Sequence, residues 1–177
     1  MPYPLNPVRA KYERMKAFLA KCIDEAKNVG EAITRGWLTA LVDDNDRQDN
    51  ATPEFLRDPA TGASLEIDSY FRKLALGIEG NGPQHYVAMG RFDEQTVLAQ
   101  RARDERKRKA AVAAGVTLVV VHAHDLSLEG MLRKLKGLAP LRSLLDAEPV
   151  IEMLEARSAR YRKACKAYPI PADALGD

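Results

Sequence analysis

The chain has 177 residues, a little more than one domain of about 150 residues, and 46% of its residues are hydrophobic and 29% charged. These proportions exclude a wholly disordered, collagen-like or coiled-coil protein. No apolar run approaches the roughly 18 residues of a membrane span, and the first residues lack the apolar stretch of a secretory signal, so we expect a cytoplasmic protein with no membrane partner. Cys22 and Cys165 lie far apart, which leaves any metal to oxygen or histidine ligands.

The net charge of +2 hides blocks of opposite sign. Residues 43–58 hold six acids and two bases, residues 100–109 hold two acids and six bases, and residues 126–166 hold five acids and nine bases. Such basic blocks either bind a polyanion or form solvated helix faces, and a neighbouring site is needed to decide between the two.

Apolar spacings of three and four predict a helix over residues 12–26 and a second helix after Asn28 and Gly30, which interrupt the pattern. Glu31 stands in the first turn of the second helix, where a carboxylate suits the positive end of the helix. Residues 42–55 read as a loop, and the turn-forming residues that follow indicate that the strands begin after position 63.

Two alternating apolar runs on either side of Arg72 and Lys73 predict a β-hairpin with a two-residue turn. In that register Asp68 and Glu79 share one face of the sheet, and Gly77 leaves open space beside Asp68. An odd-numbered turn would point Glu79 to the other face. Two carboxylates on one face need a cation such as Mg²⁺ to neutralise them, unless the face is simply the polar outside of the sheet.

A long basic helix is predicted over residues 93–114, with Gly115 as its C-cap residue. The β-branched run at 116–123 predicts a strand buried on both faces, so that strand, helix and strand form a crossover unit. Further helices are predicted over 128–138 and after Asp146, and we expect Trp37 and the tyrosines of the last helix to lie in the core.

One stripe of the long helix is polar in its middle and apolar at its ends; its members are Val97, Gln100, Asp104, Lys107, Ala111 and Ala114. If the alanines lie on the sheet, then Gln100, Asp104 and Lys107 continue towards the edge of the sheet, where burial would require polar partners. A rotated helix would leave all three in water.

Five segments in order resemble the PD-(D/E)XK nuclease superfamily: GE before an apolar helix, LEID, LALGIEGNGPQHY, QRARDERK and GVTLVVV. The likeness is closest to the very-short-patch-repair-like branch and covers residues 30–126. Its most specific part is I-E-x-N-G-x-Q-H-Y followed by Q-x-x-x-D-x-x-K. The resemblance implies an α/β, restriction-endonuclease-like core of helix, three-stranded antiparallel meander, crossover helix and parallel strand over residues 29–126. Residues 1–28 and 127–177 are then helical extensions.

The resemblance also implies roles for the acids. Asp68 and Glu79 match the metal-binding acids of the two long strands, and Glu31 matches the helix glutamate that completes the cluster. Alternatively, the Glu31 carboxylate could only interact favourably with the positive end of its helix dipole, with no role in a metal site.

The lysine usually expected two positions after the strand acid is absent, because Asn81 stands there. In members where the lysine has migrated, the charge comes from the helix, and Lys107 could supply it here with Gln100 and Asp104 as neighbours. His85 matches the histidine just beyond the strand, although a histidine in a Gly/Pro loop could also be a surface residue. His122 and His124 receive no role.

These observations predict a Mg²⁺-dependent endonuclease, with Mn²⁺ as a substitute, that hydrolyses phosphodiester bonds in nucleic acid, preferentially DNA. The basic residues expected to contact backbone phosphates are Arg101, Arg108, Lys109 and Arg160. The C-terminal helices are a candidate homodimer surface. Two alternatives remain: a non-catalytic nucleic-acid-binding or scaffold module that retains the fold, and a helical interaction protein that binds a protein partner through residues after Ser127.

Overall fold

One four-stranded sheet organises the fold of the computed structural model, which describes residues 6–88 and 93–172. Its strands are β1 (Arg47–Ala51), β2 (Ile67–Phe71), β3 (Leu76–Asn81) and β4 (Thr117–His122), in the order β1-β2-β3-β4. The first three strands form an antiparallel meander, and β4 pairs parallel to β3.

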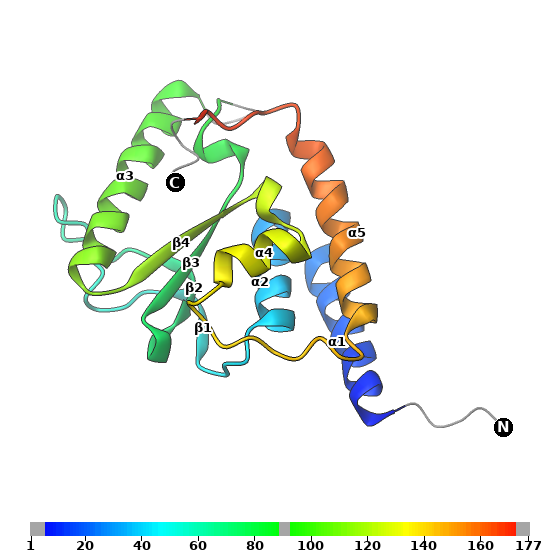
Figure 1. Cartoon of the computed structure of the whole chain (residues 1–177). Coiled ribbons are helices and arrows are strands. Elements are labelled where there is room, and N and C mark those ends of the chain that lie inside the picture. Colours follow the sequence, from blue (N-terminus) through cyan, green and yellow to red (C-terminus); the bar gives the residue numbers. More distant parts are fainter. Residues whose placement is uncertain (1–5, 89–92, 173–177) are drawn as a thin grey trace.

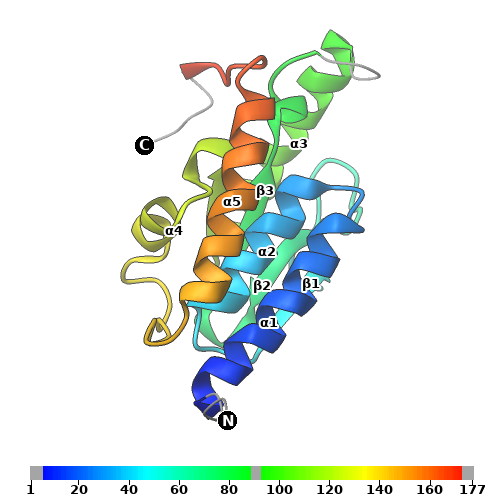
Figure 2. The same ribbon diagram turned by 90° about the vertical axis from the view of Figure 1, so that its right-hand side faces the viewer.

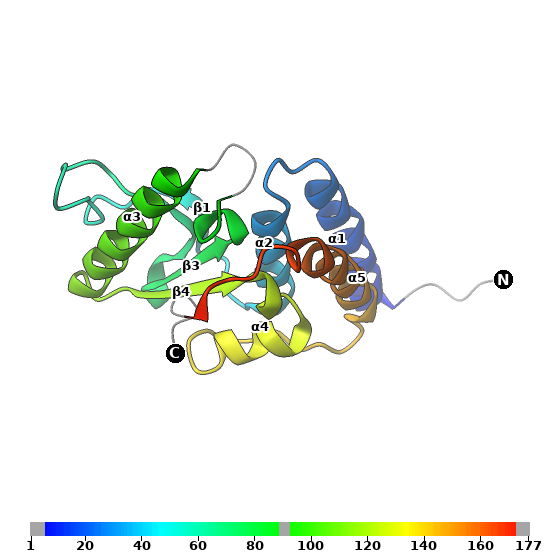
Figure 3. The same cartoon turned by 90° about the horizontal axis from the view of Figure 1, so that it is seen from above.

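The helices of the described residues are α1 (Pro7–Asp24), α2 (Val29–Leu41), α3 (Glu94–Ala113), α4 (Leu128–Leu135) and α5 (Glu148–Cys165). Helix α3 connects β3 to β4 and covers one face of the sheet, while α2 and α4 cover the other face (Figure 1). Figure 3 shows α1 and α5 as a further layer outside α2. The mixed α/β class expected from the sequence is confirmed.

Helix boundaries follow local capping chemistry. The side chains of Asn28 and Asp93 accept hydrogen bonds from the backbone at the starts of α2 and α3, at Glu31 and Thr96. Gly115 has φ +73° directly after the end of α3, as its expected C-cap role requires.

Two helix predictions at the carboxyl side need correction. Helix α4 ends at Leu135 rather than at residue 138, because the chain turns away at Lys136 and Gly137 adopts φ +74°. Tyr168 is one of the tyrosines of the last helix expected in the core, but it follows the end of α5 and is 37% exposed.

The β2–β3 hairpin has a longer connection than the two-residue turn predicted at Arg72 and Lys73. Residues 72–75 form a 3₁₀ turn that ends at Ala75 with φ +47°, and the register pairs Phe71 with Leu76. Because the turn is longer by two residues, an even number, side-chain alternation is kept from the Phe71–Leu76 pair to the Ser69–Ile78 pair. Ile67 departs from the expected alternation, since it packs with Tyr70 and Ala111 rather than with Phe71.

The space predicted beside Asp68 is filled. A Cβ atom on Gly77 would lie 2.7 Å from Leu118 and 3.2 Å from Ile67. Gly77 therefore permits close packing of β2, β3 and β4 rather than an opening for a ligand.

Two strands differ from their sequence interpretation. The segment that reads as a loop contains β1, whose exposed, polar residues lack an apolar alternation and are held by backbone pairing with β2. Strand β4 is predicted to be buried on both faces, but it is an edge strand in which Leu118, Val119 and Val120 are only partly buried.

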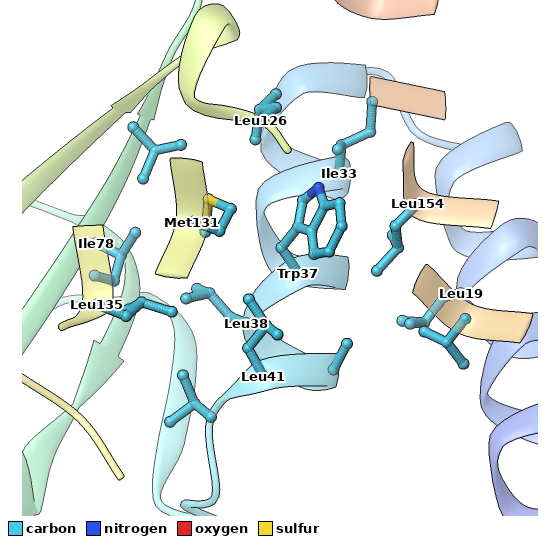
Figure 4. Close-up of a cluster of buried hydrophobic side chains, with 14 of the residues drawn as sticks. Leu19, Ile33, Trp37, Leu38, Leu41, Ile78, Leu126, Met131, Leu135 and Leu154 are labelled. Atoms are coloured by element: carbon cyan, nitrogen blue, oxygen red, sulfur yellow. The ribbon is translucent and has the colours of Figure 1, made fainter. Parts of the chain in front are cut away.

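A single hydrophobic cluster joins α2 to the sheet and to both helical extensions. Trp37 is fully buried at its centre, and its indole Nε1 donates to Ser158 Oγ of α5 at 2.9 Å (Figure 4). The cluster also includes Leu19 of α1 and Leu135 of α4. Helices α1, α2 and α5 lie side by side (Figure 2). The described parts of segments 1–28 and 127–177 thus share one core with residues 29–126.

Across residues 6–88 and 93–172, no helix combines the length and the apolar character needed to cross a membrane.

The buried position of Leu38 predicts a large difference between two leucines in helices. Leu38→Ala should lower the free energy of unfolding by about 2–5 kcal/mol, because Leu38 is 1% exposed and its removal leaves a cavity. Leu98→Ala on α3 is the matched control, since Leu98 is 65% exposed, and should change stability by less than about 1 kcal/mol. Urea unfolding measures both values, and equal losses would contradict the described core.

Candidate active site

Two carboxylates meet where β2 and β3 leave their pairing. The register that pairs Ser69 with Ile78 places Asp68 opposite Glu79 when it is continued by one residue. Asp68 Oδ2 accepts a hydrogen bond of 2.8 Å from the backbone N–H of Gly80. Asp68 and Glu79 therefore lie together, as predicted, although in a different register from the one expected.

Lys107 reaches this pair from α3. Its ammonium donates to Glu79 Oε2 at 2.7 Å, and the side chains are 11% and 8% exposed. Ala111, one turn further along, is fully buried, so this part of the helix presents Ala111 and Lys107 to the sheet. Ala114, expected on the same stripe, is exposed, because it lies beyond the last residue of α3. The prediction that this stripe faces the sheet is confirmed for Lys107.

Glu79 retains one oxygen without a partner. Its Oε1 is buried and accepts no hydrogen bond from any residue that the structure describes. Burial raises the pKa of Glu79 to about 7, against the lowering effect of Lys107, and the charge of Asp68 raises it further. The Glu79 carboxylate is therefore only partly neutralised by the Lys107 ammonium that contacts it.

Glu31 of α2 lies near Asp68, on the α2 side of the sheet. A Cβ on Gly80 would lie 3.4 Å from Glu31 Cα, so the glycine lets α2 approach β3 closely. Burial raises the pKa of Glu31, and the charge of Asp68 raises it further. Glu31 forms an ion pair with Arg35, one turn along α2.

Arg35 binds several elements of the site together, and the sequence patterns do not single it out. Its guanidinium donates to Asn50 Oδ1 at 2.6 Å and to the backbone carbonyl of Asp68 at 3.1 Å. The i,i+4 spacing of Arg35 from Glu31 is compatible with an ion pair along the helix. The contact with Asn50 could not be predicted, because the sequence of β1 resembles a loop.

His85, Asp104 and Gln100 form a hydrogen-bonded chain beside the acids. His85 Nδ1 lies 3.1 Å from Asp104 Oδ2, and Gln100 Nε2 donates to Asp104 Oδ1 at 2.8 Å. With Asp104 as the acceptor, Nδ1 of a neutral His85 carries the proton and Nε2 is the basic nitrogen. The three residues predicted from two separate motifs thus contact one another.

Asn81 belongs to a different network. Its Nδ2 donates to the Tyr86 hydroxyl at 3.0 Å, and that hydroxyl lies 3.0 Å from His122 Nε2. Burial raises the pKa of Tyr86. Asn81 therefore holds Tyr86 rather than taking the place of the strand lysine, and the sequence assigns no role to Tyr86 or His122.

The predicted phosphate-contacting residues lie on two helices. Arg108 on α3 pairs with Glu105 at 2.8 Å, and Lys109 lies 3.4 Å from the same carboxylate. Both are exposed, whereas Arg101 on the same helix is partly buried. Arg160 is exposed on α5, on the opposite side of the sheet (Figure 3). The structure does not bring these four side chains into one patch.

Comparison with known proteins finds similar proteins in viruses. Uncharacterized protein 307L of Invertebrate iridescent virus 6 is 38% identical over 138 residues, in an alignment that covers 68% of this chain and 70% of that protein. The chain belongs to the protein 307L family. No protein-family model matches the chain, and no solved structure matches it.

Two further viral proteins are similar over shorter stretches. Uncharacterized protein 033L of Invertebrate iridescent virus 3 is 42% identical over 73 residues, 40% of this chain and 38% of that protein. Uncharacterized protein 094L of Frog virus 3 (isolate Goorha) is 38% identical over 79 residues, 43% of this chain and 51% of that protein. The chain thus matches about two fifths of the length of protein 033L and about half of the length of protein 094L. These names state no activity, substrate or partner.

The raised pKa of Glu79 predicts a pH dependence in metal-free buffer with EDTA. Because the folded protein holds this proton more tightly than the unfolded chain, whose pKa is 4.5, the free energy of unfolding falls as pH rises from about 4.5 to about 7. Glu79→Gln lacks this titratable carboxyl group. Its free energy of unfolding should therefore fall by about 1–3 kcal/mol less than that of the parent over the same pH range. Urea unfolding at several pH values tests the difference, and parallel curves would contradict it.

Proposed function

We propose that the protein is a metal-dependent endonuclease that hydrolyses phosphodiester bonds in DNA. The observation that carries the proposal is the meeting of Asp68, Glu79 and Lys107 at the end of β3, with one buried Glu79 oxygen unpartnered in the described structure. Asp68 and Glu79 stand at the positions of the acids that the PD-(D/E)XK resemblance implies, and Lys107 supplies from the helix the lysine that the strand lacks at Asn81. The order of helix, antiparallel meander, crossover helix and parallel strand is compatible with that superfamily's core.

The residues fit a hard divalent cation. Carboxylate oxygens are the ligands that Mg²⁺ and Mn²⁺ bind, and the unpartnered Glu79 oxygen and the neighbouring Asp68 offer them, with Glu31 next to Asp68. When bound, Mg²⁺ would stabilise negative charge on the phosphate and lower the pKa of a water molecule. Asp68, Glu79 and Glu31 are the residues that would hold it.

Lys107 and His85 provide the remaining chemistry. In hydrolysis, water attacks phosphorus, the bond to the leaving oxygen breaks, and that oxygen takes up a proton. The Lys107 ammonium, held at Glu79, can stabilise the charge that develops on the phosphate. His85 can accept or donate a proton through Nε2, while Asp104, itself held by Gln100, orients the imidazole.

The lysine assignment is tested by the rate of DNA cleavage. Lys107→Ala should lower the rate on the order of a hundredfold, because a positioned cation acts mainly as charge develops, while DNA affinity changes little. Lys109→Ala is the control, since Lys109 is exposed and pairs only with Glu105 in the described residues. Single-turnover cleavage and a binding titration measure both. Equal rates for the two variants would remove Lys107 from the site.

The phosphate contact expected of Arg160 predicts a salt effect on DNA binding. Arg160→Glu should reduce the slope of log affinity against log salt by about one unit for each phosphate that the variant no longer neutralises. Arg9→Glu is the matched control, because Arg9 is exposed near the start of α1, at the end of the molecule away from the end of α5 (Figure 2). Equal slopes for the two variants would exclude Arg160 from the interface.

Binding of DNA without cleavage in Mg²⁺ or Mn²⁺ would favour the non-catalytic module instead.

A further inference from the structure

A second group of potential metal ligands lies apart from Asp68 and Glu79, at the last residue of β4 and in the turn that follows. His122, His124 and Asp125 each offer one ligand atom, and these atoms all lie within 4.8 Å of one another. The chain has three histidines, and this group holds two of them. The imidazole rings of His122 and His124 are stacked, with centroids 5.4 Å apart and 10° between their planes.

His122 carries a buried nitrogen without a partner. The side chain is 2% exposed, and among the described residues no group hydrogen-bonds its Nδ1 within normal geometry, although His122 and Asp125 form a capping box in which the His122 side chain faces the backbone N–H of Asp125. The nearest charged oxygen, Oδ2 of Asp125, lies 3.6 Å away, beyond hydrogen-bond distance. An unpaired polar atom in this setting is costly unless a ligand completes it.

The other nitrogen of the same ring is held. His122 Nε2 lies 3.0 Å from the Tyr86 hydroxyl, which also receives a hydrogen bond from Asn81. A phenol oxygen can accept both bonds, and with the proton on Nε2 the His122 Nδ1 lone pair points away from Tyr86. Fixing one ring nitrogen so that the other can bind metal is the usual support for a histidine ligand.

Asp125 is anchored through one oxygen. Oδ2 accepts the backbone N–H of His122 at 3.0 Å and lies 3.3 Å from the Lys134 ammonium. Oδ1 lies 3.5 Å from His124 Nε2 and 3.8 Å from Arg133. Lys134 and Arg133 therefore compete with any bound cation, although the Arg133 side chain is 62% exposed and can move into water.

We propose that His122, His124 and Asp125 bind a divalent transition-metal ion of the zinc class. Two imidazole nitrogens and one carboxylate oxygen suit Zn²⁺ and similar ions better than Mg²⁺, which prefers oxygen alone. Three protein ligands leave one position for water, and His124, 55% exposed, opens the group to solvent. Through His122 and Tyr86 the ion would fix the segment that carries His85.

The site is tested on the whole protein by Zn²⁺ titration calorimetry, with Mg²⁺ in excess to occupy carboxylate sites. We expect about one Zn²⁺ per chain. His124→Ala should weaken binding at least tenfold without unfolding the protein, because the side chain is mostly exposed. His85→Ala, which removes the remaining histidine, is the control and should bind Zn²⁺ as the parent does.

A second variant tests the competing charges. Arg133→Ala should tighten Zn²⁺ binding, since it removes a cation that faces Asp125. Failure of the parent to bind Zn²⁺, or equal affinity in His124→Ala and the parent, would overturn the proposal. Both readouts omit DNA, so an inactive nuclease site would leave them unchanged.

Discussion

The ion pair between Lys107 and Glu79 is the interaction on which the arrangement of the site depends. Both side chains are about nine-tenths buried, so each has lost most of its hydration. The contact of 2.7 Å recovers part of that cost, but one Glu79 oxygen remains unpartnered within the described residues. Removing either partner would leave a buried charge alone, which ties the position of α3 to that of β3.

The acidic residues around this ion pair distinguish it from an ion pair that only stabilises the fold. Asp68 adds negative charge close to both Glu79 and Glu31, and burial raises the pKa of both glutamates. Arg35 neutralises Glu31 and holds the backbone of Asp68, so the cluster combines fixed cations with unfilled carboxylate capacity. A bound cation would relieve the repulsion between the carboxylates, and a phosphate bound at the same place would lie near the Lys107 ammonium.

Much of this cluster could be predicted from the sequence, for identifiable reasons. Asp68 and Glu79 share a site because side-chain alternation depends only on whether the turn length is odd or even, and both the predicted and the observed turn are even. Lys107 follows from helical spacing relative to Ala111. These inferences use local periodicity, which a single sequence displays directly.

Features set by tertiary contact could not be predicted. Strand β1 has a polar sequence and exists through its pairing with β2, so the position of Asn50 beside Arg35 was hidden. The partly exposed β4 resembles a buried strand in composition, because its burial depends on its place at the edge of the sheet. The link from Asn81 through Tyr86 to His122 joins residues that are distant in the chain, which no local pattern connects.

The most direct test of the account is cleavage of supercoiled, linear, single-stranded and mismatched DNA by the parent and by Asp68→Ala, each with Mg²⁺ and with EDTA. The account predicts cleavage of at least one substrate by the parent in Mg²⁺ and none in EDTA or with the variant, because Asp68 belongs to the proposed metal site. Folding of the variant is checked by its thermal unfolding, in which Mg²⁺ should stabilise the parent alone. Cleavage by a folded Asp68→Ala protein at the parent's rate, or cleavage that persists in EDTA, would contradict it.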